Sequence, residues 1–425
     1  MDFKKSVIKG VKWTSFSTII LAVVAIAKIS ILTRYLNKSD FGLIAMITFI
    51  LNFMDLFNDM GISTAILHKQ NISKKEYSSL YWSNLGLSIF LYIAVLLATP
   101  LIVDFYNQPQ LSIITPLLAL NLIFTGIGRQ FKVILQKELN FKLLAIADIS
   151  SALISIILAV YLAIKGFGVF SLVYSTILQM FLSNCTFVVL GFSKHKISFY
   201  CNLALIKDFF RIGMYQVGGQ VANYFNRDLD ILIIGKLFNA QVLGGYSLAK
   251  QLVFRPFQLI NPVIIKVASP VLAKSQNDPE SLKINYLKLL NSVSSLNILI
   301  YVLLILFSNQ AIEILYGKDY LNVSILVKIL SVYMIFRAIG NPVGSLVVAT
   351  GRTDLDFKWN LLTLAVIPLA VFTGSRWGIE FVALSLTISM MILFYPSWKY
   401  LINKMTIISF KEYIKAAFLV SFKFK

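Results

Sequence analysis

Five polar residues recur at helical spacing within one stretch of the sequence. Gln216, Gln220, Asn223, Arg227 and Asp230 follow one another at steps of four, three, four and three positions. An α-helix advances about 100° per residue, so the five side chains would share one face of a helix. Amide groups suit the hydroxyl groups of sugars, and the planar guanidinium group of an arginine matches a phosphate. The spacing predicts a polar helix face that could bind a sugar phosphate.

The next apolar stretch repeats this pattern. Gln251, Arg255 and Gln258 fall on one side of it, and Pro256 and Pro262 should kink the helix or leave backbone carbonyl groups without partners. Polar side chains also hold membrane helices together through buried hydrogen bonds, so the amide groups could serve packing instead of binding. The pattern leaves both roles open.

Charged residues also lie inside apolar stretches. A charge within a membrane helix costs several kcal/mol on insertion scales, so these residues imply a polar interior or ion pairs. The cations are Lys28, Arg227, Lys250, Arg255, Lys266, Lys328 and Arg337, and the acids are Asp55, Asp59, Asp148, Asp228 and Asp230.

We assign these residues to three predicted groups. The substrate-binding cations are Lys28, Arg227, Lys250, Arg255 and Arg337. The polar face of the cavity is formed by Gln216, Gln220, Asn223, Gln251 and Gln258. The acids Asp55, Asp59, Asp228 and Asp230 either carry a coupling ion, since a desolvated carboxylate can hold a proton near neutral pH, or only balance the cations.

Composition sets the class of protein. The chain has 425 residues, of which 58% are hydrophobic and only 14% charged. Apolar runs of about 20 residues recur along it, the length that spans a bilayer as a helix. A net charge of +20 would suggest nucleic acid in a soluble protein. In a membrane protein the basic residues instead set its orientation, so no nucleic-acid partner is predicted.

Enzyme signatures are missing from the sequence. Only two histidines, His68 and His195, and two cysteines, Cys185 and Cys201, are present. The sequence also lacks a Walker A motif and a dinucleotide-binding fingerprint. We therefore predict that the protein is not an enzyme and has no cofactor and no metal site.

Twelve membrane helices are expected. Most lysines and arginines outside them fall in the N-terminus, the even-numbered connections and the tail, which predicts that both termini are cytosolic. The helices are expected at 12–33, 41–66, 79–103, 111–131, 143–164, 168–192, 209–235, 243–272, 287–308, 321–348, 358–375 and 378–402.

The chain repeats itself. Residues 31–45, "ILTRYLNKSDFGLIA", return as residues 233–247, "IIGKLFNAQVLGGYS", and a segment at 124–142 resembles one at 336–358. Parallel repeats of this kind build transporters whose substrate site lies between the halves. The repeat predicts two pseudo-symmetric six-helix bundles at 1–200 and 201–405, followed by a basic tail at 406–425.

Two glycine-containing segments correspond in this repeat. They are "TGIGRQ" at 125–130 and "AIGNPVG" at 338–344. Glycine and proline there could form a hinge at the cytosolic mouth, or the glycines could let helices pack closely. Both interpretations remain open from the sequence.

Several segments, in their order and spacing, resemble a known family. They are "LNKSDFGLIAMITFI", "DMGISTAILHKQNISKKEYSSLYWSNLGL", "PLIVDFYNQPQL", "LQKELNFKLLAIADISS", "KGFGVFSLV" and "LGGYSLAKQLVFRPFQLINPVI". Together they resemble the Wzx-type polysaccharide-transport flippases of the multidrug/oligosaccharidyl-lipid/polysaccharide exporter superfamily. The resemblance implies a V-shaped fold of two bundles around a cationic cavity. Members often continue with a further helical hairpin, whereas residues 410–425 are too short and basic to span. That tail is expected to be an interfacial helix or the beginning of a thirteenth span.

The resemblance also implies a function. A multi-pass protein of the bacterial inner membrane would flip an undecaprenyl-diphosphate-linked oligosaccharide repeat unit, by alternating access, for O-antigen, capsule or exopolysaccharide synthesis. Its expected partners are this lipid-linked substrate, a proton or sodium ion, membrane lipids and the polysaccharide polymerase and assembly machinery. The alternatives are a cation-coupled drug exporter of the same superfamily and a membrane-embedded glycan polymerase or transferase.

Overall fold

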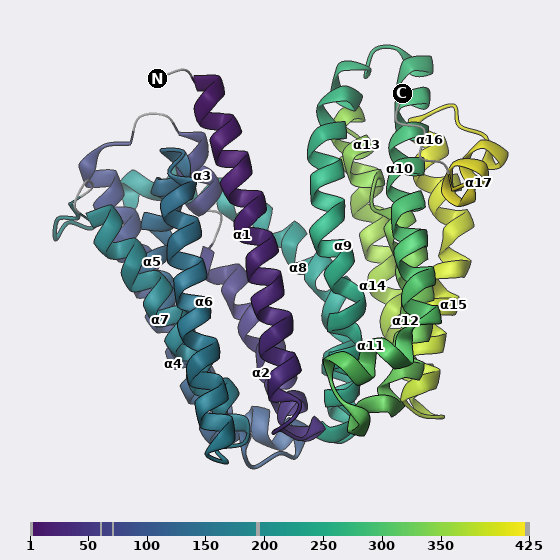
Figure 1. Ribbon diagram of the computed structural model, residues 1–425. Coiled ribbons are helices and arrows are strands. Elements are labelled where there is room, and N and C mark those ends of the chain that lie inside the picture. Colours follow the sequence, from purple (N-terminus) through teal and green to yellow (C-terminus); the bar gives the residue numbers. More distant parts are fainter. Residues whose placement is uncertain (1–2, 60–61, 70–71, 193–195, 421–425) are drawn as a thin grey trace. The chain divides into compact units, whose positions relative to one another are not determined.

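The computed structural model describes residues 3–59, 62–69, 72–192 and 196–420 (Figure 1). The side chains of residues 3–8, 64–65, 68, 208–216 and 266–267 also lie outside this description. The secondary structure of the described residues is helical, without a strand. The chain divides into two compact units, the first comprising Met1–Tyr224 and Asn239–Gln241, the second Phe225–Phe238 and Val242–Lys425. The division predicted at 200/201 stays a prediction.

The first unit is a bundle of long helices with α5 (Leu111–Lys137) at its centre. α5 packs against α4 (Lys74–Tyr106) and α7 (Val169–Phe192), while α6 (Phe141–Ile164) packs against α7 and α1 (Phe3–Leu32). Figure 1 shows these helices, coloured purple to teal, running side by side. The remaining elements of this unit are α2 (Lys38–Asp59), α3 (Ile62–His68), the 3₁₀ turn η1 (Leu203–Ile206) and the first part of α8 (Lys207–Leu237).

The second unit is built in a similar way around α12 (Ser324–Gly340). α12 packs against α10 (Pro279–Leu306) and α15 (Ile379–Ser397), and α15 packs against α14 (Thr353–Ser375). The other elements are the rest of α8, α9 (Ala240–Lys274), α11 (Ser308–Leu315), η2 (Lys318–Val323), α13 (Val343–Thr350), the π-helical turn η3 (Trp398–Ile402), α16 (Asn403–Met405) and α17 (Phe410–Phe418).

The all-helical, polytopic fold predicted from the sequence is confirmed. Among the residues that the structure describes, eleven helices are long and apolar enough to cross a membrane. The predicted span at 209–235 corresponds to α8, which is not one of the eleven. Apolar side chains point out of the bundles, for example Leu97, Ile157 and Val348, which are 75%, 69% and 76% exposed. Exposed apolar side chains of this kind are suited to contact with lipid tails.

Two predicted helices are divided in the structure. The span expected at 41–66 forms α2 and α3, and the residues that join them, 60–61, lie outside the described part. The span expected at 321–348 ends as α12 at Gly340 and resumes as α13 at Val343. Pro342 lies between these helices, and because it has no backbone N–H the ladder of helical hydrogen bonds is interrupted there. The orientation of the termini stays a prediction.

Glycines of α5 are contact points between helices. A Cβ atom added to Gly126 would lie 2.0 Å from Ser88 Oγ on α4. One added to Gly128 would lie 2.3 Å from Asn184 Oδ1 and 2.8 Å from the Asn184 Cα atom on α7. In the "TGIGRQ" segment, close helix packing therefore accounts for both glycines, as small residues do elsewhere in membrane proteins.

Replacing Gly128 by alanine is expected to destabilise the first unit by about 1–3 kcal/mol, the usual range for overpacking. The backbone of α7 would have to move away from α5, because the added atom meets a main-chain atom there. Thermal unfolding in detergent micelles measures the effect. Gly86→Ala on α4 is the matched control, since an added Cβ atom meets nothing within 4 Å. Equal stability of the two variants would contradict the packing role.

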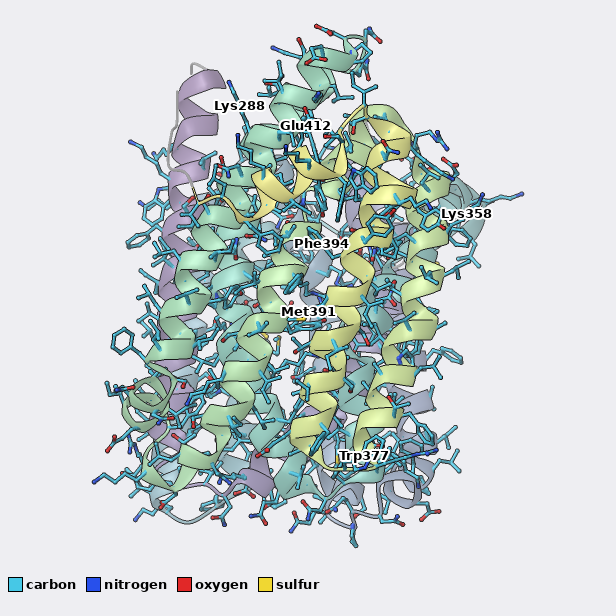
Figure 2. All side chains as sticks on the ribbon, turned by 90° about the vertical axis from the view of Figure 1, so that its right-hand side faces the viewer. Lys288, Lys358, Trp377, Met391, Phe394 and Glu412 are labelled. Carbon is cyan, nitrogen blue, oxygen red and sulfur yellow. The ribbon has the colours of Figure 1, made fainter. Side chains whose placement is uncertain are left out.

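The tail contains a short amphipathic helix, α17, which packs on the second unit. Figure 2 shows α17 lying crosswise to the long helices, with Glu412 and Phe394 labelled. The Tyr413 ring of α17 is buried and stacks on the Phe394 ring of α15 at 4.9 Å between centroids. Asn291 of α10 donates hydrogen bonds to the Ala416 and Leu419 carbonyl groups at 3.0 and 2.6 Å. Residues 421–425 lie outside the described part.

Two local contacts fix the beginning of α17. Ser409 and Glu412 form a capping box, in which the Ser409 side chain accepts from the Glu412 backbone N–H and the Glu412 carboxylate accepts from the Ser409 N–H. Glu412 also pairs with Lys283 of α10 at 2.7 Å. The hydrogen bond from Lys283 and those from Ser409 lower the pKa of Glu412 to about 2.

We expect α17 to stay docked between pH 7 and 5 and to loosen between about pH 4.5 and 2. A depressed carboxyl pKa contributes stability above the unfolded value, and this stability is lost as the pH falls through the folded value. Hydrogen exchange of the α17 amide groups, corrected for intrinsic rates, measures the loosening. Glu412→Gln should raise their exchange at pH 7 and remove the acid dependence. An unchanged acid dependence in this variant would assign it to another group.

Candidate functional site

An arginine of α5 holds both acids of α2 in the first unit. Arg129 pairs with Asp55 at 2.5 Å and with Asp59 at 3.6 Å. The predicted span at 111–131 contains Arg129, which was not among the cations assigned to the apolar stretches. α5 continues to Lys137, so Arg129 lies well inside the helix. Here Asp55 and Asp59 are engaged in charge pairing, and the coupling role that the sequence left open stays a prediction.

Buried amide groups accompany this ion pair. Asn58 donates to the Leu122 carbonyl at 3.2 Å and accepts from Ser88 Oγ at 2.6 Å. Asn84 donates to the Gly126 carbonyl at 3.3 Å. These side chains join α2, α4 and α5 through hydrogen bonds, as buried polar groups do between membrane helices.

Lys28 has neutral partners in the first unit. Its ammonium group donates to Ser155 Oγ of α6 at 3.0 Å, and Ser155 donates in turn to the Ser175 carbonyl of α7 at 2.8 Å. No carboxylate pairs with Lys28 among the residues that the structure describes. The charge of Lys28 is therefore not compensated by an acid of these residues.

A buried ion cluster lies between α8 and α9 in the second unit. Lys250 is 7% exposed and Asp230 5% exposed. The Lys250 ammonium group donates to Asp230 Oδ1 at 2.7 Å, to Asp228 Oδ1 at 3.1 Å and to the Arg227 carbonyl at 2.7 Å. Tyr246 donates its hydroxyl proton to Asp230 at 2.5 Å. The charges of this cluster are largely satisfied within it.

Arg227 belongs to the same cluster. Its guanidinium group pairs with the neighbouring Asp228 at 2.7 Å, and its side chain is 46% exposed. The two acids and two cations of the cluster thus balance each other. Lys250 is shielded from any ligand in this structure, whereas the exposed part of Arg227 could contact one.

Arg255 and Arg337 have no carboxylate partner among the described residues. Arg337 donates to the Tyr333 hydroxyl at 2.7 Å and lies over the Phe254 ring, with 5.5 Å from its guanidinium carbon to the ring centroid. The aromatic rings stabilise this cation without neutralising it. Arg255 is half-buried on α9. These two arginines are available to an anion in a way that Lys250 is not.

One face of α9 is polar and open. Gln251 and Gln258 are exposed on either side of the half-buried Arg255, at the predicted spacing. α9 is nevertheless apolar enough overall to cross a membrane. On α8, Asn223 is exposed and Gln220 half-buried, while the side chain of Gln216 lies outside the described residues. The predicted roles of these amide groups stay predictions.

The predicted cations are of two kinds. Lys250 and Arg227 are neutralised by neighbouring acids, whereas Lys28, Arg255 and Arg337 meet no acid in the part of the chain that the structure describes. Uncompensated arginines in membrane helices are costly unless they serve a ligand or a watery surface. Their guanidinium forks suit phosphate or carboxylate oxygen atoms.

The chain matches a known protein family and several of its relatives. The family model described as "Polysaccharide biosynthesis protein" matches residues 31–325, more than half of the chain. The lipopolysaccharide biosynthesis protein WzxC of Escherichia coli (strain K12) is 29% identical over 420 residues, covering 99% of this chain and 85% of WzxC. The teichuronic acid biosynthesis protein TuaB of Bacillus subtilis (strain 168) is 28% identical, covering 88% of this chain and 77% of TuaB.

Solved structures share the fold. The lipid II flippase MurJ, in an inward closed conformation, superposes with a TM-score of 0.76 at 19% identity, over 96% of this chain and 90% of that one. A transporter from Pyrococcus furiosus that is described as a member of the MOP superfamily superposes with a TM-score of 0.59 at 16% identity, over 93% of this chain and 95% of that one. The family resemblance predicted from the sequence is confirmed. The predicted location, as a multi-pass protein of the inner membrane, is also confirmed.

Proposed function

Because the chain belongs to the polysaccharide biosynthesis protein family, we propose that it is a flippase for a lipid-linked oligosaccharide. The substrate is an undecaprenyl-diphosphate-linked repeat unit of a surface polysaccharide. The head group crosses the inner membrane by alternating access, while the prenyl chain stays in lipid. The names of WzxC and TuaB and the fold shared with MurJ support this proposal.

The polar face of α9 is the observation that carries the proposal. Gln251 and Gln258 are exposed on α9 beside an arginine that has no acid partner among the described residues, and such groups need polar neighbours that lipid tails do not supply. Amide groups can bond sugar hydroxyls, and Arg255 can bond a phosphate. This face therefore suits a hydrated sugar diphosphate.

The diphosphate is expected to bind the uncompensated cations. Arg255 and Arg337 belong to the second unit, and Lys28 belongs to the first. An anion at Arg255 would not have to displace a carboxylate, whereas binding at Lys250 would first break its bonds to Asp228 and Asp230. We therefore propose Arg255 and Arg337 as the phosphate contacts, and the predicted role of Lys28 stays a prediction.

Transport is proposed to be coupled to a proton or sodium gradient. Asp55 and Asp59 share one arginine among the described residues, so the cluster of these three residues carries one excess negative charge. Asp55 is also 46% exposed, which makes it accessible to an ion from water. These features support the α2 acids as the site of coupling.

Deletion of the gene in its host tests the proposal. The expected result is loss of the surface polysaccharide and accumulation of the undecaprenyl-diphosphate oligosaccharide on the cytosolic leaflet, measured by mass spectrometry of extracted lipids. Re-expression of the intact chain should restore the polysaccharide. Normal polysaccharide with no trapped lipid, together with new sensitivity to cationic compounds, would indicate drug export instead.

A further inference from the structure

The Lys250 ammonium group is surrounded by oxygen atoms. Asp230 Oδ1 and Oδ2 lie at 2.7 and 3.0 Å, Asp228 Oδ1 at 3.1 Å and the Arg227 carbonyl oxygen at 2.7 Å from Nζ. Three of these atoms are carboxylate oxygens and one is a main-chain carbonyl. Carboxylate and carbonyl oxygens are also the ligands that hard metal cations prefer in proteins. Nζ thus occupies the position that a bound cation would take in such a cage.

The charge balance shows which cation would fit. Asp228 and Asp230 carry two negative charges, and Arg227 returns one positive charge through its pair with Asp228. Without the ammonium group the cluster would therefore carry one negative charge. A buried excess charge is strongly unfavourable, so a cation would be drawn in. A single charge is balanced by a monovalent cation.

Further hydrogen bonds hold Asp230 in the cage. Asp230 also accepts from the Tyr246 hydroxyl and from the backbone N–H of Ile231, at 2.5 and 3.0 Å. Tyr246 is 1% exposed. These bonds hold the carboxylate in place independently of Lys250, so the oxygen cage should persist when the lysine side chain is shortened.

We propose that Lys250 is a resident cation that occupies a monovalent cation site, and that removal of its ammonium group turns this cage into a sodium-binding site. In the intact protein the cation position of the α8–α9 cluster is always occupied by the Lys250 ammonium group, which is covalently attached to the chain. It therefore does not exchange sodium with the solvent. If transport is driven by sodium, the exchanging ion binds elsewhere in the chain.

Thermal unfolding of the full chain in detergent micelles tests this inference. Lys250→Ala should be stabilised by NaCl over choline chloride at equal ionic strength, with a rise in Tm of about 2 °C or more when the sodium concentration is well above its dissociation constant. The intact protein should show no difference between the two salts. A response of equal size in both proteins would place the sodium site elsewhere and overturn the proposal, as would a folded Lys250→Ala with no response.

A second variant covers the case in which Lys250→Ala does not fold. Lys250→Ala combined with Asp228→Asn leaves one cation, Arg227, and one acid, Asp230, so its charge is balanced again. This variant should be recovered folded and should be insensitive to sodium. Failure of both variants to fold would show that Lys250 serves packing, not charge, and would overturn the proposal. The unfolding readout does not depend on transport, so it is independent of the proposed function.

Discussion

Replacing Arg255 by glutamate is expected to reduce export of the lipid-linked oligosaccharide about 10- to 100-fold. Arg255 has no acid partner among the described residues, so its charge is available to the diphosphate, and reversal would place like charges against each other. Flipping of the lipid-linked repeat unit in membrane vesicles, or surface polysaccharide in a deletion strain that expresses the variant, measures the loss.

Two comparisons make this prediction specific. Arg255→Lys keeps the charge but loses the two-pronged geometry, and it should retain intermediate activity. Arg227→Glu should affect export less through phosphate binding, because Arg227 is already paired with Asp228. Wild-type export by Arg255→Glu, at a normal level of the protein in the membrane, would remove Arg255 from the substrate site.

Replacing Asp230 by alanine is expected to destabilise the second unit by about 3–5 kcal/mol, the range for breaking a buried ion pair. Lys250 would lose two of its four oxygen contacts, and the Tyr246 hydroxyl would lose its acceptor in a buried position. Denaturation by SDS or heat in detergent micelles, followed by circular dichroism, measures the change.

Asp228→Ala is the matched control for this variant. Asp228 is more exposed than Asp230, and its removal leaves Lys250 with both contacts to Asp230. It should cost less than half as much stability as Asp230→Ala. Equal losses would mean that the two acids share the lysine evenly, contrary to the distances in the cluster.

Much of the fold could be predicted from residue patterns alone. The length and apolar character of the helices follow from the bilayer thickness, so α4, α6 and α7 were expected within a few residues of their bounds. The end of a helix was less predictable where polar residues follow its apolar run. α5 runs on to Lys137, beyond the end predicted at residue 131, and Arg129 of the same helix was not recognised as a charge within an apolar stretch.

The candidate site was predictable only in part. The spacing of Gln251, Arg255 and Gln258 placed them on one face of a helix, and the structure keeps that face open. The sequence also grouped Lys250 with Arg255 as equivalent cations. They lie five positions apart on α9 and so point to different sides of the helix, where Lys250 meets two acids and Arg255 meets none of the acids that the structure describes.

By itself, the sequence determined that this is a many-helix membrane protein and which side chains share a helix face, because hydropathy and helical period are local properties. Only the tertiary structure decided which charges neutralise each other. Arg129 reaches Asp55 from a separate helix, and Lys250 reaches Asp230 across the α8–α9 contact. Such pairs form where segments that are distant in the sequence pack together. The spacing of residues along the chain therefore does not determine which cations lie within a few ångströms of an acid.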